Sequence, residues 1–220
     1  MGKRCKPELL AWGISLASLL VALYFLPSLP AQVPTHWNMA GQIDGYGPPL
    51  SILQLPLVAL GLNLMLSFLP LIDPKRQNYQ KFAGVYHLLR LILSLFFAGL
   101  TGILLYSSYH PGALQVNALI LAGIGLMLSF IGNYLPKIKP NYFVGVRTPW
   151  TLASETVWRK THRLSGFLWF AGGLVLAVMG FLLHDGALFV ACAVLFVGMV
   201  GIPFVFSFLA FRSEKGKTQK

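Results

Sequence analysis

Long apolar runs alternate with short polar segments along the whole chain, and this alternation is typical of a membrane protein. A helix needs about 20 residues to cross a bilayer core of roughly 30 Å, and in lipid it satisfies its own backbone hydrogen bonds. A membrane β-barrel would alternate apolar and polar residues, whereas the chain from Leu91 to Leu105 is apolar almost throughout. The pattern predicts an all-α, polytopic membrane protein whose six transmembrane helices cover approximately 9–27, 51–72, 84–106, 116–135, 164–183 and 187–210.

Composition agrees with this pattern. Apolar residues make up 56% of the 220 residues, charged residues only 10%, and the mean hydropathy is +0.69. These values exclude an ordinary water-soluble domain. The first run follows basic residues and precedes Ala31, as a signal peptide would, but its apolar stretch exceeds the usual 7 to 15 residues. We therefore expect a retained helix.

The basic residues gather on one side of the predicted membrane. All 17 lie at the N-terminus, within 75–90, within 137–163 or at the C-terminus, and none lies in 28–50, 107–115 or 184–187. Because cytoplasmic loops are rich in Lys and Arg, both termini are predicted to be cytoplasmic. The same asymmetry and the anionic lipids it faces account for the net charge of +11, so no direct nucleic-acid binding is predicted.

Two of the predicted helices share a pattern. Arg90 to Gly99 aligns without gaps to Arg163 to Gly172, with six of ten positions identical, and the same offset places Gly125 on Gly198. The similarity suggests a parallel repeat of helices 3–4 and 5–6, over 84–135 and 157–208, as in some transporters. Apolar helices also match by chance, so both readings stay open.

The repeat suggests two domains. An N-terminal helical hairpin would occupy 1–83 and carry an extracellular loop at 28–50. A four-helix domain would occupy 84–220 and carry a cytoplasmic loop at 133–163.

Small residues recur at a spacing of four in the predicted helices. They form the pairs Ala98 and Gly102, Ala118 and Ala122, Gly125 and Ser129, and Gly173 and Ala177. Lipid offers no hydrophobic drive for helix association, so these faces are predicted to pack through close backbone approach. Pro56 and Pro203 are predicted to kink the second and sixth helices.

Arg90 and His87 are ionisable residues within the third predicted helix, and such residues merit a functional hypothesis. We expect Arg90 to snorkel toward the cytoplasmic interface. The functional alternative pairs Arg90 with a cytoplasmic acid, Asp73 or Glu155, at the inner mouth of the bundle.

The extracellular loop is rich in turn-forming residues and poor in charge. It presents four candidate contact residues, His36, Trp37, Asn38 and Asp44. The loop suits contact with a peptide or lipid surface. His36 and Asp44 lack a third ligand, so no metal site is predicted.

The cytoplasmic loop is the richest segment in candidate recognition residues. It contains no nucleotide-binding glycine pattern, no paired carboxylates and no nucleophile with an evident base, so no enzyme activity and no cofactor are predicted. Its candidates for partner binding are Asn133, Asn141, Gly145, Arg147, Thr148, Trp150, Glu155, Trp158, His162 and Arg163.

Local contacts within this loop can also be predicted. We expect Glu155 to form a salt bridge with Arg147 or Arg159, and Ser154 to cap a helix that continues into the fifth span. Trp150 and Trp158 suit anchors at the headgroup level.

The chain resembles the SdpI family of bacterial membrane immunity proteins. The resemblance rests on Ile131-Gly-Asn-Tyr-Leu-Pro, on the run from Lys139-Pro-Asn-Tyr-Phe to Arg147-Thr-Pro-Trp-Thr-Leu, and on Val157-Trp-Arg-Lys-Thr-His-Arg-Leu-Ser-Gly. Val33-Pro-Thr-His-Trp-Asn and Gly41-Gln-Ile-Asp-Gly-Tyr are similar to an uncharacterised N-terminal domain that often precedes that motif.

The resemblance implies a multi-pass protein of the bacterial plasma membrane. The founding member of the family gives immunity to a secreted sporulation-delaying toxin and captures a small winged-helix repressor at the membrane. We therefore expect toxin immunity and signalling, with membrane lipids, a secreted toxin peptide and a cytoplasmic repressor as partners. A transporter or lipid-binding protein is the alternative, and it predicts a polar cavity among helices three to six, near the midplane of the membrane. An enzyme that binds a headgroup through Asn133, Asn141, Arg147 and His162 ranks third.

Overall fold

The computed structural model describes residues 6–183 and 185–218, and it confirms the all-α polytopic fold. Six helices in these residues are long and apolar enough to cross a membrane. They are α1 (Lys6–Phe25), α2 (Gln54–Ile72), α3 (Ala83–Tyr109), α4 (Val116–Tyr134), α6 (Glu155–Leu182) and α7 (Asp185–Thr218), and a short helix α5 (Pro149–Ala153) precedes α6.

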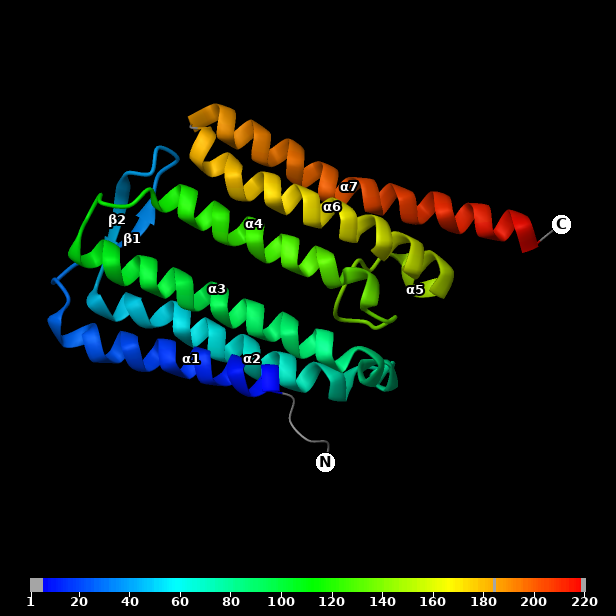
Figure 1. Ribbon diagram of the computed structural model, residues 1–220, viewed down its shortest axis with the longest axis horizontal. Helices are drawn as coiled ribbons and strands as arrows, with labels where there is room; N and C mark the ends of the chain where they lie inside the picture. The colour runs from blue at the N-terminus through cyan, green and yellow to red at the C-terminus, as the bar shows by residue number, and fades with distance from the viewer. Residues whose placement is uncertain (1–5, 184, 219–220) are drawn as a thin grey trace.

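The six long helices lie roughly side by side in two groups (Figure 1). Helices α1, α2 and α3 pack on one another and form the first bundle. Helix α6 packs between α4 and α7, and these three form the second bundle. Helix α3 contacts α1 far more than it contacts α4. Helix α3 therefore packs with the first bundle, although the predicted boundary between residues 83 and 84 assigns it to the C-terminal domain. That domain boundary stays a prediction.

A small β-hairpin covers one end of the helices (Figure 1). Strands β1 (Val33–Trp37) and β2 (Ile43–Gly47) pair antiparallel, with Val33 opposite Gly47 and Trp37 opposite Ile43. The Asn38 side chain accepts a hydrogen bond from the Gln42 amide at 3.0 Å and closes the turn. We call this the hairpin end. The opposite end, which carries the α2–α3 connection and the loop before α6, is the loop end.

Glycine contacts hold α4 against α6. A Cβ atom on Gly173 would lie 2.5 Å from the Gly125 carbonyl oxygen, and one on Gly132 would lie 2.5 Å from the Phe170 amide nitrogen. Such proximity leaves no room for a side chain, so the two backbones approach as the small-residue pattern predicts.

The other small pairs differ. Ala118 is buried, and its Cα would lie 3.1 Å from a Cβ on Gly180 of α6. Gly102 on α3 is exposed and has open space around it, so that pair does not form the predicted packing face.

The prolines divide in the same way. Pro203 lies inside α7 as predicted. Pro56 lies in the first turn of α2, where its missing N–H would have had no intrahelical acceptor, so it gives no reason for a kink. Pro70 is the proline inside α2.

The parallel repeat stays a prediction, because its paired positions have different surroundings. Gly125 lies against the α6 backbone, whereas only one atom, from Ile202, lies within 4 Å of a Cβ placed on Gly198. Arg90 is buried and the aligned Arg163 is exposed.

Candidate functional site

The segment 138–154 at the loop end is a folded cap, and Asn141 is its centre. The Asn141 side chain is fully buried. Its amide group donates to the carbonyls of Lys139 and Val144, both at 2.9 Å. Its oxygen accepts the backbone N–H groups of Phe143 at 2.9 Å and Val144 at 2.6 Å. One side chain thereby determines the course of the loop, which leaves Asn141 without a free group for a partner.

Asp73 at the end of α2 joins the first bundle to this cap. Its carboxylate is 2% exposed and accepts hydrogen bonds from the Tyr142 amide at 2.9 Å, the Tyr79 hydroxyl at 2.9 Å and the Lys75 amide at 2.7 Å. The nearby Asn78 side chain donates to the Pro140 carbonyl at 2.8 Å. The sequence predicts Asp73 only as a possible partner of Arg90. Its place directly after an apolar helix and before basic residues was the signal for a structural role.

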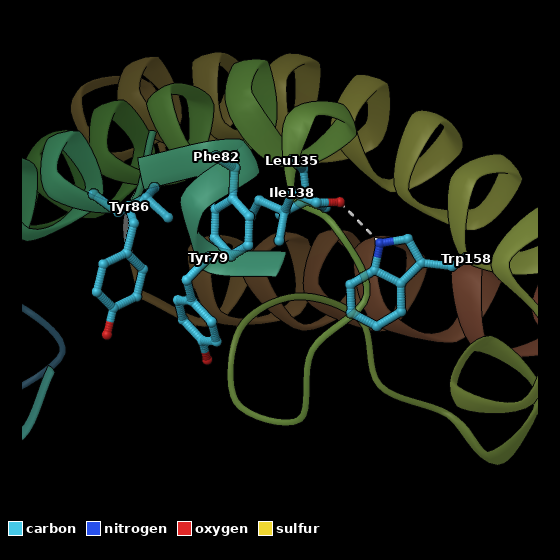
Figure 2. Close-up of a cluster of buried hydrophobic side chains, with 7 residues drawn as sticks. Tyr79, Phe82, Tyr86, Leu135, Ile138 and Trp158 are labelled. Carbon is cyan, nitrogen blue, oxygen red and sulfur yellow. Dashed lines mark hydrogen bonds between the residues drawn. The ribbon is translucent and has the colours of Figure 1, made fainter. Parts of the chain in front are cut away.

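Trp158 packs beneath the cap in a row of buried apolar side chains, which Figure 2 shows with Tyr79, Phe82 and Tyr86 on the side of the first bundle. Its indole N–H donates to the Ile138 carbonyl at 2.9 Å, and the side chain is 1% exposed. Trp158 is therefore a core residue, and the prediction that it anchors the protein at the headgroup level is wrong. The cap folds over α6 and removes this position from the membrane surface.

His162 lies one turn beyond Trp158, and both of its ring nitrogens have partners inside the protein. Nδ1 lies 2.9 Å from the Trp158 carbonyl, to which it can only donate, and Nε2 accepts the Val146 N–H at 3.1 Å. This pair of contacts requires the neutral ring with its proton on Nδ1. Gly145 has a φ of +110°, and a Cβ there would overlap the His162 ring. Gly145 and His162 are therefore matched parts of the cap.

The beginning of α5 is fastened to α7. Thr148 is buried, caps α5 by accepting the Thr151 amide at 3.2 Å, and donates to the Ser207 hydroxyl of α7 at 3.0 Å. Trp150 packs against Phe204 and Phe208 of α7, with ring centroids 5.3 and 5.1 Å away.

The beginning of α6 is fastened to α7 as well. Ser154 caps α6 as predicted, accepting the Val157 amide at 3.2 Å, and its hydroxyl lies 2.6 Å from a carboxylate oxygen of Glu214. The C-terminal part of helix α7 thus holds the edge of the cap.

The remaining loop-end candidates lie on the surface. Asn133, Arg147, Glu155 and Arg163 are exposed. The Arg147 guanidinium donates to the Tyr142 carbonyl at 2.6 Å, which orients it without covering it. In the described part of the chain no ion pair joins Glu155 to Arg147 or Arg159, so the predicted bridge is wrong. Besides Asp73, Glu214 of α7 reaches the cap, where it contacts Ser154 from 60 positions away in sequence.

The four residues of the suggested headgroup site do not act together. Asn133 and Arg147 are exposed, whereas Asn141 and His162 are fully buried and hydrogen-bonded within the cap. The exposed surface at this end includes Arg147, part of Trp150 and basic residues of α6, and the buried candidates give that surface its shape.

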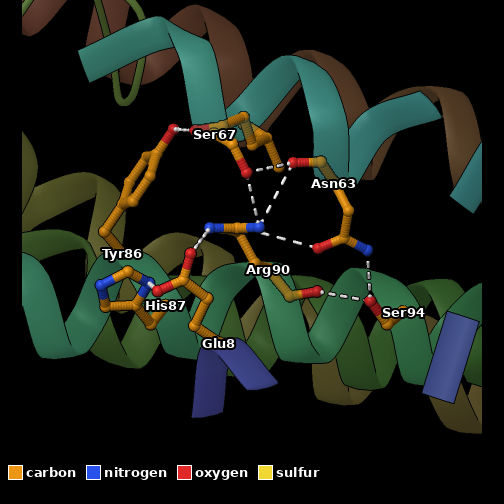
Figure 3. Close-up of polar contacts among 8 residues, drawn as sticks. Glu8, Asn63, Ser67, Tyr86, His87, Arg90 and Ser94 are labelled. Atoms are coloured by element: carbon orange, nitrogen blue, oxygen red, sulfur yellow. Dashed lines mark hydrogen bonds and ion pairs between the residues drawn. The ribbon is translucent and has the colours of Figure 1, made fainter. Parts of the chain in front are cut away.

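A polar network lies inside the first bundle, and Arg90 is its centre (Figure 3). Arg90 is 2% exposed and forms an ion pair with Glu8 of α1 at 3.1 Å. Its guanidinium also donates to the Ser67 hydroxyl at 2.9 Å and to the Asn63 backbone carbonyl at 3.3 Å. Both predictions for Arg90 are wrong: it does not snorkel, and its partner is neither Asp73 nor Glu155. Helix α1 brings in an acid that lies 82 positions away in sequence.

The network continues on both sides of this ion pair. His87 lies one turn before Arg90, with its Nδ1 atom 3.7 Å from Glu8. On the other side the Asn63 amide donates to the hydroxyls of Ser15 at 3.0 Å and Ser94 at 2.8 Å, so α1, α2 and α3 each contribute. Arg90 and His87 could be identified from the sequence because they are ionisable. Asn63 and the serines are uncharged, so nothing in the sequence distinguished them from other helix residues.

The hairpin end contains the four candidates that were predicted for an extracellular loop. His36 Nδ1 and an Asp44 carboxylate oxygen lie 2.5 Å apart across the two strands, and both side chains are exposed. Trp37 is partly buried against the helices, and Asn38 forms the turn. The predicted loop is thus an ordered β-hairpin. No strand was predicted there.

Comparisons with known proteins match two parts of the chain. Residues 137–207, which include the cap, α6 and most of α7, match the SdpI/YfhL protein family. Residues 13–60, which include the hairpin, match a domain of unknown function, DUF1648. The chain is 24% identical over 195 residues to the immunity protein SdpI of Bacillus subtilis (strain 168), an alignment that covers 89% of this chain and 91% of that protein. No solved structure matches. With six apolar helices and these matches, the chain is a multi-pass cell-membrane protein that is similar to the SdpI/YfhL family over residues 137–207.

Proposed function

We propose that this protein protects the cell that carries it from a secreted, membrane-active toxin peptide. The observation that carries the proposal is the match to SdpI, which extends over both ends of the molecule. An ordered hairpin at one end can meet a peptide from outside. A folded, basic cap at the other end can meet a soluble partner.

This proposal includes an orientation. The loop end, with the termini and the basic residues, faces the cytoplasm, and the hairpin end faces outward. A small winged-helix repressor would dock on the cap, where Arg147 is exposed beside Trp150. Because the cap is joined to the first bundle through Asp73 and to α7 through Thr148, a shift of either bundle would alter the docking surface.

Survival of a toxin-sensitive strain tests the proposal. Cells that express the chain should survive the sporulation-delaying toxin, whereas cells with an empty vector should die. Unchanged killing at normal membrane levels of the protein would contradict immunity.

Repressor capture is tested separately. Replacing Arg147 with Gln should reduce recruitment of the repressor to membranes while survival and protein level stay unchanged. Arg76→Gln, which alters a basic residue in the α2–α3 connection outside the cap, is the matched control. Equal recruitment by both variants would contradict docking at the cap.

A transporter remains the second candidate because a cavity of about 370 Å³ lies between α3 and α4. A transporter of polar solutes requires polar groups along its path, but this cavity is lined by apolar side chains such as Leu95, Ile103 and Met127. The lining suits contact with an apolar chain better than passage of a polar solute.

A further inference from the structure

The hairpin is held to the helices by one polar side chain, Asn117 at the beginning of α4. Its amide group donates to the carbonyls of Asn38 at 2.8 Å and Met39 at 3.0 Å. Among the described residues no other hydrogen bond joins the hairpin, 33–47, to a helix. Asn117 thus binds two consecutive peptide carbonyls, the group that any peptide segment offers.

Three cavities surround this contact, with volumes of about 310, 410 and 310 Å³, and Asn117 lines all three. We call them together the hairpin cleft. Ile120 lies on the same face of α4 as Asn117 and lines two of the cavities. Helices of both bundles contribute, since Gln54 and Leu104 lie on one side and Gly180 and Leu188 on the other. A ligand in the cleft would therefore touch both bundles.

The lining of the cleft indicates the class of ligand. Trp37, Met39, Leu188 and Phe189 provide apolar and aromatic surface, and Met and Trp adapt well to apolar side chains. The polar side chains of the lining are Thr35, His36, Asn38, Ser51, Gln54, Gln115 and Asn117. None of the described lining residues carries a carboxylate, ammonium or guanidinium group. Such a lining can orient a ligand through hydrogen bonds while apolar surface holds its side chains.

Charge distinguishes a peptide from an anionic lipid. No Lys or Arg occurs in 28–50, 107–115 or 184–187, the segments that connect helices at the hairpin end. A phosphate headgroup would find no cation there, whereas a peptide needs only donors and acceptors for its backbone.

We propose that the hairpin cleft binds an apolar segment of the secreted toxin peptide, with Asn117 donating to peptide carbonyls. This inference rests on the proposed immunity function and names its binding site. Binding in the cleft competes with the hairpin for Asn117 and contacts both bundles, which gives the ligand a means to shift one bundle against the other.

The experiment uses the full chain in lipid nanodiscs with fluorescently labelled sporulation-delaying toxin as the probe. Ile120→Trp fills the cleft and should weaken binding by about tenfold or more, the effect of blocking a central contact. Ile124→Trp is the matched control because it makes the same change one turn further along α4, and Ile124 lines none of the three cavities. The control should bind as the unaltered chain does.

Cys192 provides a second measurement that needs no change in the cleft, since it lines one of the cavities. In a Cys5→Ser background, bound toxin should slow alkylation of Cys192 by a membrane-permeant reagent. This measurement tests the proposal even when Ile120→Trp fails to fold.

The outcomes separate the site from the function. If cells survive but both Trp variants bind the toxin equally, the cleft is not the binding site and the immunity proposal stands. The same holds if cells survive but bound toxin does not protect Cys192. Neither survival nor binding of the toxin by the unaltered chain would overturn both. Protection of Cys192 by lipid alone, with no further effect of toxin, would assign the cleft to lipid and overturn the peptide site.

Discussion

The two bundles associate by different physical means, although all their helices are similarly apolar. In the first bundle, α1, α2 and α3 meet around buried polar groups, with the Glu8–Arg90 ion pair and Asn63 at the centre. In the second bundle, α4 and α6 meet through glycines whose backbones touch. Lipid supplies no hydrophobic drive for either, so the first bundle relies mainly on polar bonding and the second mainly on close packing, to which the Ser129 hydroxyl of α4 adds one hydrogen bond to the Phe170 carbonyl of α6.

This difference bears on how each bundle can respond. A glycine contact has one geometry and fails when a side chain is inserted, which suits a rigid support for the cap. A polar network has donors and acceptors that can exchange partners or water. We therefore expect the first bundle to be the adjustable part and the second bundle to be the fixed part.

The largest effect is expected from inserting a side chain between α4 and α6. Leucine at Gly125 would overlap backbone atoms of Gly173 and Ala177, and these atoms cannot yield unless the helices separate. Gly125→Leu should destabilise the protein by more than about 4 kcal/mol, in the range reserved for severe core changes. Thermal unfolding in detergent measures this loss.

Gly102→Leu is the control for that change, because Gly102 has open space around it and should cost less than about 0.5 kcal/mol. Similar losses for the two variants would show that glycine contacts are not what holds the second bundle.

The next effect concerns the buried ion pair of the first bundle. Arg90→Leu leaves Glu8 without its cation and should cost about 3–5 kcal/mol, whereas the double variant Glu8→Leu with Arg90→Leu should cost less because no charge is stranded. Unfolding by titration with a denaturing detergent compares them.

Arg163→Leu is the matched control, since the aligned Arg163 is exposed. A double variant no more stable than Arg90→Leu would mean that a stranded charge is not the source of the loss.

The smallest effect is expected in the cap. In Gly145→Ala an alanine must adopt a positive φ, which destabilises the cap by about 1–3 kcal/mol, and its Cβ atom also presses on the His162 ring. The loop 138–148 should therefore become sensitive to protease. Gly112 also has a positive φ, +78°, but it has open space around it, so Gly112→Ala measures the destabilisation caused by the positive φ alone.

Hydrogen exchange should show that Gly145→Ala leaves α1 to α3 unchanged. Loosening of the first bundle to the same degree would contradict the separation of the two bundles.

Local features were accessible from the sequence because they depend on neighbouring residues. The six spans follow from the length of apolar runs, the Ser154 cap from residues three positions apart, and the packing of Gly125 and Ser129 from their spacing on one helix face. The resemblance to the SdpI family was accessible too, because the motif that carries it is a continuous run.

Features that join distant segments were not accessible in this way. Asp73 and Glu155 are the acids near Arg90 in the predicted cytoplasmic segments, but the packing of α1 against α3 makes Glu8 its partner. Trp158 is a residue type that often anchors proteins at the membrane interface, yet the cap folds over it and the Ile138 carbonyl accepts a hydrogen bond from its indole N–H. Nothing local distinguishes a buried tryptophan from an exposed one.

The sequence by itself determined that the chain is a six-helix membrane protein with its basic residues on one side, because hydropathy and charge are summed along the chain. Tertiary structure alone decided which candidates are free to meet a partner. The cap is shaped by Asn141, Gly145 and His162, whereas Arg147 stays exposed. The reason is that a buried polar group must find its hydrogen-bond partners inside the protein, wherever in the sequence they lie.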